Sequence, residues 1–198
     1  MVTLDTYILG WRPDDEDHAY NPFLKPDSIG VALGFSDPVF RQIVKDELSH
    51  EVEDDMGAAA TLWSKTIFPG YSHEWKDLEF LKQHWPADKI ILKGIQTVAD
   101  ARKAAELGLG GIVVSNHGGR QVDGCVASLD MLKDINTAVG DKIDLLFDSG
   151  IRCGADIAKA LALGAKAVMV GRPYVYGLAF GGQAGVEHVL KCELPVHS

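Results

Sequence analysis

The sequence has no excess of basic residues. Among its 198 residues, 28 Asp and Glu outnumber 19 Lys and Arg to give a net charge of −9. A surface that binds nucleic acid or an anionic membrane needs a basic patch, and this charge balance argues against one. We therefore expect neither partner, although a few arginines can still form a local anion site.

Long apolar runs are absent and cysteine is scarce. No apolar run approaches the ~20 residues that cross a membrane, and Asp5 interrupts the only apolar stretch near the N-terminus, so no signal-peptide pattern is present. The three cysteines, Cys125, Cys153 and Cys192, share no metal-ligand spacing. This pattern predicts free thiols, a reducing compartment and no bound metal. Since the sequence also lacks a terminal Ser-Lys-Leu, we expect a cytoplasmic protein.

The most informative segment present is Ser115–Gln121, which follows the apolar stretch Gly111–Val114. It contains His117, two glycines and Arg120. An imidazole moves a proton near neutral pH, glycine lets the backbone approach a ligand closely, and a guanidinium clamps a carboxylate or phosphate. A buried strand that ends in these residues predicts an active site, with a polar connecting loop as the alternative.

Short apolar runs alternate with alanine-rich helical patterns from about Lys89 onward. The predicted strands cover 89–93, 111–115, 143–147 and 167–170, and the predicted helices cover 97–107, 128–138, 155–163 and 184–191. The first half is less regular, with a predicted strand at 2–4 and predicted helices at 38–48 and 74–83. Such apolar strands indicate a parallel sheet buried under helices.

The strand ends carry polar residues, and the pattern repeats. The stretch 107–114 matches 163–170 as a helix end, a glycine and a strand. In a (β/α)8 barrel the catalytic residues lie at the carboxyl ends of the strands. We therefore predict an α/β fold of the (β/α)8 TIM-barrel type, present in residues 1–198 as a single partial barrel of about five βα units. The stretch 13–88 would be a long lid insertion between strands.

Several ordered segments resemble the signatures of the FMN-dependent 2-hydroxy-acid oxidases and dehydrogenases, a family that includes lactate oxidase, glycolate oxidase and lactate 2-monooxygenase. The segments that carry this resemblance are Leu92–Ile95, Ser115–Gln121, Asp148–Arg152, Gly171–Pro173 and, at the N-terminus, Asp5–Arg12. The long insertion and the form Asp-Ser-Gly-Ile-Arg are most similar to the lactate 2-monooxygenase branch. The resemblance covers the second half continuously and implies that the first three βα units of the family barrel lie outside this sequence.

The resemblance assigns a role to each candidate residue. His117 would be the base, oriented by Asp5, while Arg120 and Arg12 would hold the substrate carboxylate. Lys93 would place positive charge near the N1–O2 edge of the flavin. Thr3 and Ser115 would contact the isoalloxazine ring. The residues implied to bind the ribityl chain and phosphate of FMN are Asp148, Ser149, Gly150, Ile151, Arg152, Gly171 and Arg172.

The implied function is FMN-dependent oxidation of a small, lactate-like L-2-hydroxy acid. The product would be the 2-oxo acid or its decarboxylated derivative, and O₂ would reoxidise the flavin. Two alternatives stay open: a catalytically silent half-barrel, and another phosphate-binding TIM-barrel enzyme. Five strands cut from a barrel would expose two sheet edges, so we also expect a homo-oligomer or a partner that covers them.

Overall fold

The computed structural model describes residues 1–10, 12–13, 17–21, 23 and 29–193. The chain divides into two compact units. Unit 1 consists of Met1–Asp5 and His73–Ser198, and unit 2 consists of Thr6–Ser72. The lid role predicted for residues 13–88 stays a prediction, and part of that stretch lies outside the described residues.

Unit 1 contains a parallel sheet of five strands in the order β1-β2-β3-β4-β5. The strand bounds are β1 (Val2–Thr3), β2 (Ile91–Ile95), β3 (Gly111–Val114), β4 (Asp144–Phe147) and β5 (Ala167–Val168). Spatial order therefore follows chain order, as it does in successive βα units. The α/β class predicted from the alternating pattern is confirmed.

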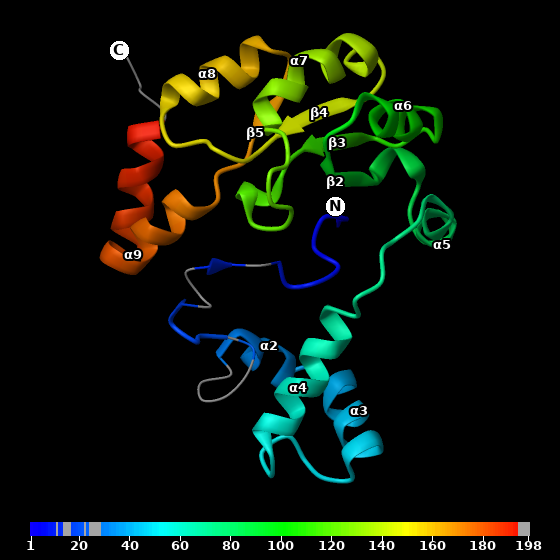
Figure 1. Ribbon diagram of the computed structural model, residues 1–198, viewed down its shortest axis with the longest axis vertical. Helices are drawn as coiled ribbons and strands as arrows, with labels where there is room; N and C mark the ends of the chain where they lie inside the picture. Colours follow the sequence, from blue (N-terminus) through cyan, green and yellow to red (C-terminus); the bar gives the residue numbers. More distant parts are fainter. Residues whose placement is uncertain (11, 14–16, 22, 24–28, 194–198) are drawn as a thin grey trace. The chain divides into compact units, whose positions relative to one another are not determined.

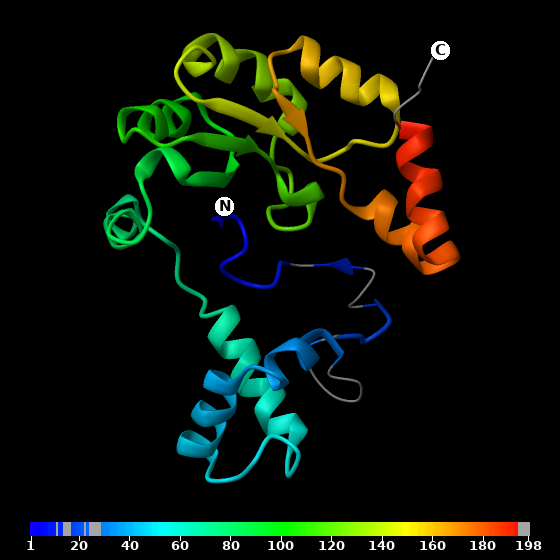
Figure 2. The same ribbon diagram turned by 180° about the vertical axis from the view of Figure 1, so that it is seen from behind.

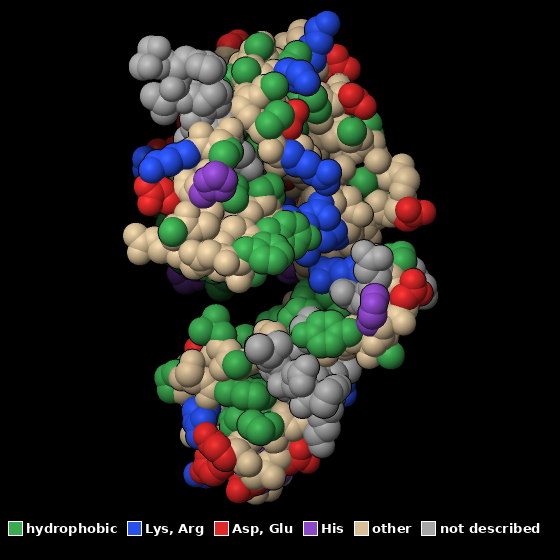
Figure 3. Space-filling model, turned by 90° about the vertical axis from the view of Figure 1, so that its left-hand side faces the viewer, with side chains coloured by type: hydrophobic (Ala, Val, Ile, Leu, Met, Phe, Trp, Pro, Cys, Tyr) green, Lys and Arg blue, Asp and Glu red, His purple; other side chains and the backbone are tan. Residues whose placement is uncertain are grey.

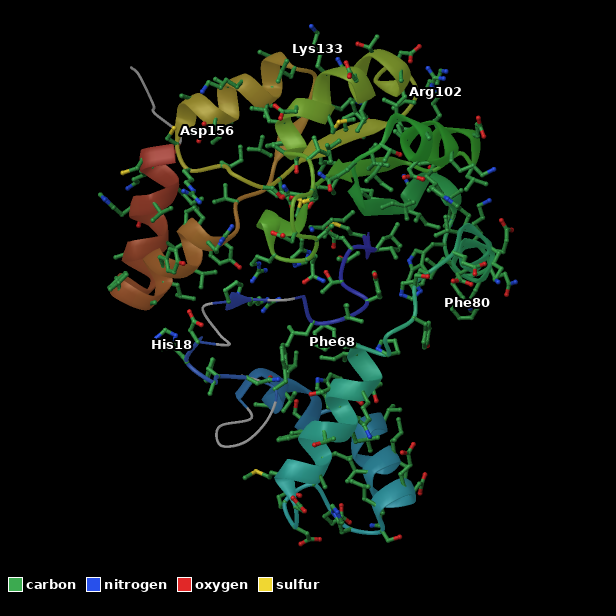
Figure 4. The ribbon with its side chains drawn as sticks, viewed as in Figure 1. His18, Phe68, Phe80, Arg102, Lys133 and Asp156 are labelled. Atoms are coloured by element: carbon green, nitrogen blue, oxygen red, sulfur yellow. The ribbon has the colours of Figure 1, made fainter. Side chains whose placement is uncertain are left out.

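The connecting helices cover one face of this sheet (Figures 1 and 2). They are α6 (Val98–Glu106), α7 (Ser128–Val139) and α8 (Gly154–Ala162), preceded by η2 (Trp75–Asp77), α5 (Leu78–Lys82) and η3 (Ala87–Lys89). Each helix turns an apolar stripe inward. Ala101 and Leu132 are fully buried, whereas Arg102 and Lys133 are exposed on the outer side of α6 and α7 (Figure 4).

The core of unit 1 forms between the strands and these helices. Leu92 pairs in register with Ile112, and Ile112 pairs with Leu145. All three side chains are almost fully buried and belong to one cluster with Leu132 and Ile135 of α7. Within these three strands Lys93 of β2 is a buried charged residue among mainly apolar neighbours, and further polar side chains follow where the strands end.

The predicted helix ends in unit 1 agree closely with the structure. The Thr97 hydroxyl accepts a hydrogen bond from the Asp100 amide and caps α6. Gly108 follows the end of this helix with a φ of 70°, the left-handed conformation that glycine adopts without cost. Glycine recurs after α8, where Gly164 has a φ of 107°.

The last helix differs from its prediction. The sequence predicts helix only over 184–191, but α9 covers Arg172–Glu193 with a break at Gly181 and Gly182. The two halves of α9 approach closely where Gly177 meets Gly185, since a Cβ built on Gly177 would lie 2.7 Å from the Gly185 carbonyl oxygen. The strand β5 is also shorter than predicted, ending at Val168.

Unit 2 is helical within its described residues. Its elements are η1 (Ile29–Val31), α2 (Ala32–Phe35), α3 (Pro38–Leu48) and α4 (Met56–Ile67). The bounds of α3 match the prediction, and the Asp37 carboxylate caps it by accepting from the Phe40 amide at 2.8 Å. The sequence analysis missed α4, although Asp55 caps it and Ala59 and Ala60 are buried. Phe40 packs edge-on against Trp63 of α4, with ring centroids 4.8 Å apart.

Candidate functional site

The carboxyl ends of the five strands bring the predicted polar residues of unit 1 together. Because the strands are parallel, everything that follows a strand appears at the same edge of the sheet. The residues placed there are Asp5 after β1, Lys93 in β2, Ser115 and His117 after β3, Asp148 and Ser149 after β4, and Gly171 and Arg172 after β5.

Lys93 lies at the centre of this group. Its Nζ lies 3.4 Å from Asp5 Oδ2 and 3.5 Å from Asp148 Oδ2, and it donates to Ser115 Oγ at 3.0 Å. The residue is 8% exposed. A buried ammonium needs such partners, because leaving it unpaired would cost far more than the pairing gains. The pairing of β2 with β3 shifts between Lys93 and Ile95, so a local irregularity in β2 lies next to this lysine.

His117 and Asp5 are joined by a short hydrogen bond. The His117 Nδ1 lies 2.8 Å from Asp5 Oδ1 and 3.4 Å from Lys93 Nζ. An ammonium can only donate and a carboxylate can only accept. The shorter contact therefore assigns the proton on Nδ1 to the hydrogen bond with Asp5, which leaves Nε2 as the basic nitrogen of the neutral ring.

The turn after β3 has an uncommon backbone. The φ values of His117, Gly118 and Gly119 are 57°, 70° and 72°. They lie in the left-handed region, which residues other than glycine rarely adopt. Two serine hydroxyls hold this turn. The His117 amide donates to Ser115 Oγ at 3.1 Å, and the Gly118 amide donates to Ser149 Oγ at 3.0 Å.

A cavity of about 620 Å³ opens beside this turn. Its volume lies within the range of sites that bind small molecules and cofactors. Three arginines, Arg120, Arg152 and Arg172, line it together with Lys93 and His117. Arg172 also donates to the Gly118 carbonyl oxygen at 2.8 Å, which connects α9 to the turn after β3. Figure 3 faces the α9 side and shows Lys and Arg side chains beside hydrophobic ones there.

The loop after β4 is held by a carboxylate of α8. Asp156, at the start of that helix in Figure 4, accepts from the Arg152 amide at 3.1 Å. This backbone hydrogen bond, helped by a contact from the Cys153 thiol, lowers the pKa of Asp156 below the usual aspartate value. The charged carboxylate therefore fixes the backbone from which Arg152 extends toward the cavity.

The structure does not bring every predicted residue to the cavity. Gly150, Ile151 and Gly171 line it, but Thr3 is an exposed residue of β1 and Ser115 lies beneath the turn, fully buried. Arg12 belongs to unit 2, so its part in the site stays a prediction. The other predicted residues of the site come from unit 1.

The sequence analysis missed the side of the cavity formed by the stretch after β5. Met169, Val170, Pro173, Tyr174 and Tyr176 line the cavity. The two tyrosines follow Gly-Arg-Pro closely in sequence, and this proximity was the signal that could have identified them.

The charge of the cavity suits an anionic ligand. The cavity combines Lys93, Arg152 and Arg172 with Gly150, where the absence of a side chain leaves open space beside the backbone. Among the described residues, no three His, Cys, Asp or Glu side chains group as a metal site would require. No helix in the described ranges is long and apolar enough to span a bilayer.

Comparison with known proteins gives one family. A model described as FMN-dependent dehydrogenase matches residues 1–193. An FMN-dependent alpha-hydroxy acid dehydrogenase of Schizosaccharomyces pombe is 64% identical over 194 residues, covering 98% of this chain and 47% of that protein. An L-lactate oxidase of Nostoc is 57% identical, with 96% and 48% covered. The human 2-hydroxyacid oxidase 1 is 43% identical, with the same coverage.

Solved structures show the same fold. A mandelate oxidase bound to (S)-2-phenylpropionate superposes with a TM-score of 0.69 at 36% identity, covering 96% of this chain and 46% of that one. The five-stranded sheet is therefore the corresponding part of a TIM barrel, as predicted. The chain spans about half the length of the curated relatives that it matches. FMN, the cofactor predicted from the resemblance, is confirmed at the level of the family.

Proposed function

Because the chain belongs to the family of FMN-dependent dehydrogenases, we propose that it carries the catalytic base and the phosphate-binding side of a site that oxidises a small L-2-hydroxy acid. The observation that carries this proposal is the pairing of His117 Nδ1 with Asp5 at 2.8 Å, beside a cavity lined by Arg120, Arg152 and Arg172. The names of the relatives, which refer to lactate, 2-hydroxyacids and alpha-hydroxy acids, support a lactate-like substrate.

His117 would take a proton from the substrate through Nε2. Its hydrogen bond to Asp5 holds the ring in that tautomer, and the carboxylate stabilises the imidazolium once the proton has moved. Lys93 lies 3.4 Å from both Asp5 and His117. Its ammonium therefore lies beside both partners of the Asp5–His117 hydrogen bond and holds the Asp5 carboxylate next to the ring.

Arg120 would hold the substrate carboxylate. Its Nε donates to the His117 carbonyl oxygen at 3.4 Å, so the guanidinium is attached to the same turn as the base. An anion bound by Arg120 is therefore held at a fixed distance from the imidazole, and such positioning lowers the entropic part of the barrier. We propose Arg12 as the second carboxylate ligand, by the resemblance of its segment alone.

FMN would occupy the cavity, with its phosphate at Arg152 and Arg172 and its ring system near Lys93 and Ser115. When bound, the flavin supplies the two-electron acceptor that no side chain of this protein can provide. The Asp148 Oδ2 also lies 3.5 Å from Lys93 Nζ and contributes to holding this ammonium in place. We propose Gly150, Ile151 and Gly171 as backbone contacts of the cofactor, and Thr3 as a ring contact.

We propose dioxygen as the final electron acceptor. The overall reaction balances as 2-hydroxy acid plus O₂ giving 2-oxo acid plus H₂O₂. A decarboxylating variant gives the shortened acid, CO₂ and water from the same reactants. This chemistry would take place at the described site. Further barrel units or a second polypeptide would supply the remaining walls of the cavity.

The experiment is an absorbance spectrum of the protein from about 300 to 550 nm, where flavin absorbs, taken after FMN has been added and the unbound excess removed, before and after anaerobic L-lactate. Bands that appear on binding and bleach with lactate are the expected result. His117→Gln should retain the bands and lose bleaching rate by about 10²–10⁴-fold, the usual contribution of a general base. His84→Gln, an exposed histidine of unit 1, is the control and should behave as the wild type.

Two outcomes would contradict the proposal. A protein that stays colourless with added FMN would favour the silent half-barrel. Bands that bleach equally fast in the His117→Gln variant would show that another residue removes the proton.

A further inference from the structure

Ser149 connects the two loops of the site through its hydroxyl. It follows β4, whereas the turn that it contacts follows β3. The Ser149 Oγ accepts from the Gly118 amide at 3.0 Å and from the Asn116 amide at 3.3 Å, and it donates to Asp148 Oδ1 at 2.8 Å. The Asp148 carboxylate in turn lies 3.5 Å from Lys93 Nζ.

These three contacts use the full capacity of a hydroxyl group. A serine oxygen offers one donated and two accepted hydrogen bonds. All three are directed to protein atoms, so the Ser149 side chain has no hydrogen bond left to offer a ligand. The motif resemblance placed Ser149 among the cofactor contacts, but its hydroxyl is engaged elsewhere.

The turn that Ser149 contacts has an unfavourable backbone conformation. His117 and Gly118 both have a positive φ, and a side-chain-bearing residue rarely adopts this conformation. The amides of three successive residues, Asn116, His117 and Gly118, donate to serine hydroxyls instead of to a helix or strand. Within the turn the Gly119 amide donates to the Asn116 carbonyl oxygen at 3.0 Å and to Asn116 Oδ1 at 3.1 Å. The three preceding amides depend on the serine hydroxyls for their acceptors.

Ser149 itself also has a positive φ, of 78°. Glycine would adopt this conformation at lower cost. A serine in this conformation lowers the stability of the folded backbone, and its three hydrogen bonds offset that cost.

We infer that Ser149 is a positioning residue: its hydroxyl fixes the turn that presents His117 and couples it to the Asp148–Lys93 pair, and this hydroxyl is not a ligand of the cofactor. The functional part of this inference rests on the proposed function. The structural part does not, because it concerns hydrogen bonds within the protein.

The test compares Ser149→Ala and Ser149→Gly by amide hydrogen exchange in the protein without cofactor. Both remove the hydroxyl, but only glycine also removes the backbone strain. We expect exchange at the Gly118 and Asn116 amides to accelerate by about five- to tenfold in both variants, the effect of losing one ordinary hydrogen bond. The His117 amide, which donates to Ser115 Oγ, should change much less.

Ser128→Ala is the matched control. Ser128 is a buried serine of the same unit, and its hydroxyl has no hydrogen-bond partner among the described residues. Removing it should leave exchange at Gly118 unchanged. It should also leave FMN affinity unchanged, whereas both Ser149 variants should weaken FMN binding several-fold through the displaced turn.

The results distinguish the positioning role of Ser149 from the proposed function of the site. Unchanged exchange at Gly118 in both Ser149 variants would overturn the positioning role, and weakened FMN binding in that case would identify the hydroxyl as a direct ligand. A wild-type protein that binds no FMN would count against the proposed function, while the exchange data would still decide the role of Ser149.

Discussion

At the scale of single residues, the site depends on close approaches that leave no room for additional atoms. Gly94 follows Lys93 in β2 with a φ of 100°, and a Cβ built on it would lie 2.8 Å from the Asp5 Cβ. No pair of carbon atoms tolerates that distance without movement. Gly94 therefore allows Asp5 to lie beside the strand and reach His117.

Gly94→Ala should displace Asp5 and weaken its contact with His117. The variant combines a left-handed alanine with a steric clash, so we expect it to lower the free energy of unfolding by more than the ~1 kcal/mol of a strained backbone alone. Gly108→Ala is the control, because Gly108 has a φ of 70° and open space around it. Denaturant titration of both variants measures the difference, and equal losses would show that the clash with Asp5 has no effect.

Asp156 makes a pH-dependent contribution at the same scale. Its pKa is lowered in the folded protein, chiefly by the Arg152 amide. The folded state therefore binds its proton less readily than the unfolded chain does, and the resulting stability is fully present above the ordinary aspartate pKa of 3.8. It is lost as the pH falls through the lowered pKa.

Asp156→Asn should remove this pH dependence. We expect the wild type to be the more stable protein at neutral pH, with the difference shrinking as the pH falls below 3.8. Thermal unfolding measured over this range checks the prediction. A difference that stays constant with pH would mean that Asp156 acts through packing and not through its charge.

At the scale of elements, the helices α6, α7 and α8 pack against the strands and stabilise their register. The register determines which strand-end residues lie next to one another at the site. Leu132 and Ile135 of α7 are fully buried in the core cluster. Their loss would loosen β3 and β4 together, since both strands pack against this helix. The turn that carries His117 begins where β3 ends, so its position depends on this packing.

Leu132→Ala should destabilise the protein by about 2–5 kcal/mol, the usual cost of a cavity left by a buried leucine. Lys133→Ala, at the next position on the exposed side of α7, should change stability by less than about 0.5 kcal/mol. Chemical denaturation measures both. A comparable loss in the two variants would show that α7 is not anchored through its apolar face.

At the scale of the whole molecule, the sheet of unit 1 has two unpaired edges. Within the described ranges β1 pairs only with β2, and β5 pairs only with β4. Unpaired edges and exposed apolar surface favour association. The last helix adds to this surface, because Tyr176, Leu178 and Phe180 of α9 are 59%, 53% and 92% exposed.

We expect the isolated chain to self-associate. Its weight-average mass in sedimentation experiments should rise with concentration, and Phe180→Ser should reduce the rise. Leu33→Ser, which changes an 83% exposed side chain of unit 2, is the control. A mass equal to that of the monomer at every concentration would contradict the prediction.

The sequence by itself determined the order of elements and the chemistry at their ends. The strand and helix patterns after Lys89 predicted the parallel sheet, because burial on both faces leaves an uninterrupted apolar run and glycine marks the helix ends. The same patterns placed Lys93 at the end of one predicted strand, and His117 and Asp148 after the next two. Parallel strands then bring these residues to one edge without further information.

The tertiary structure alone decided the contacts that make these residues a site. The contact of Lys93 with Ser115 and that of Ser149 with Gly118 join residues far apart in the sequence. The positive φ of His117 occurs in the turn that these contacts hold. The close approach of the two halves of α9 is likewise a contact between glycines, which carry no pattern of their own. Such features depend on distances between elements, and local propensity and periodicity describe only one element at a time.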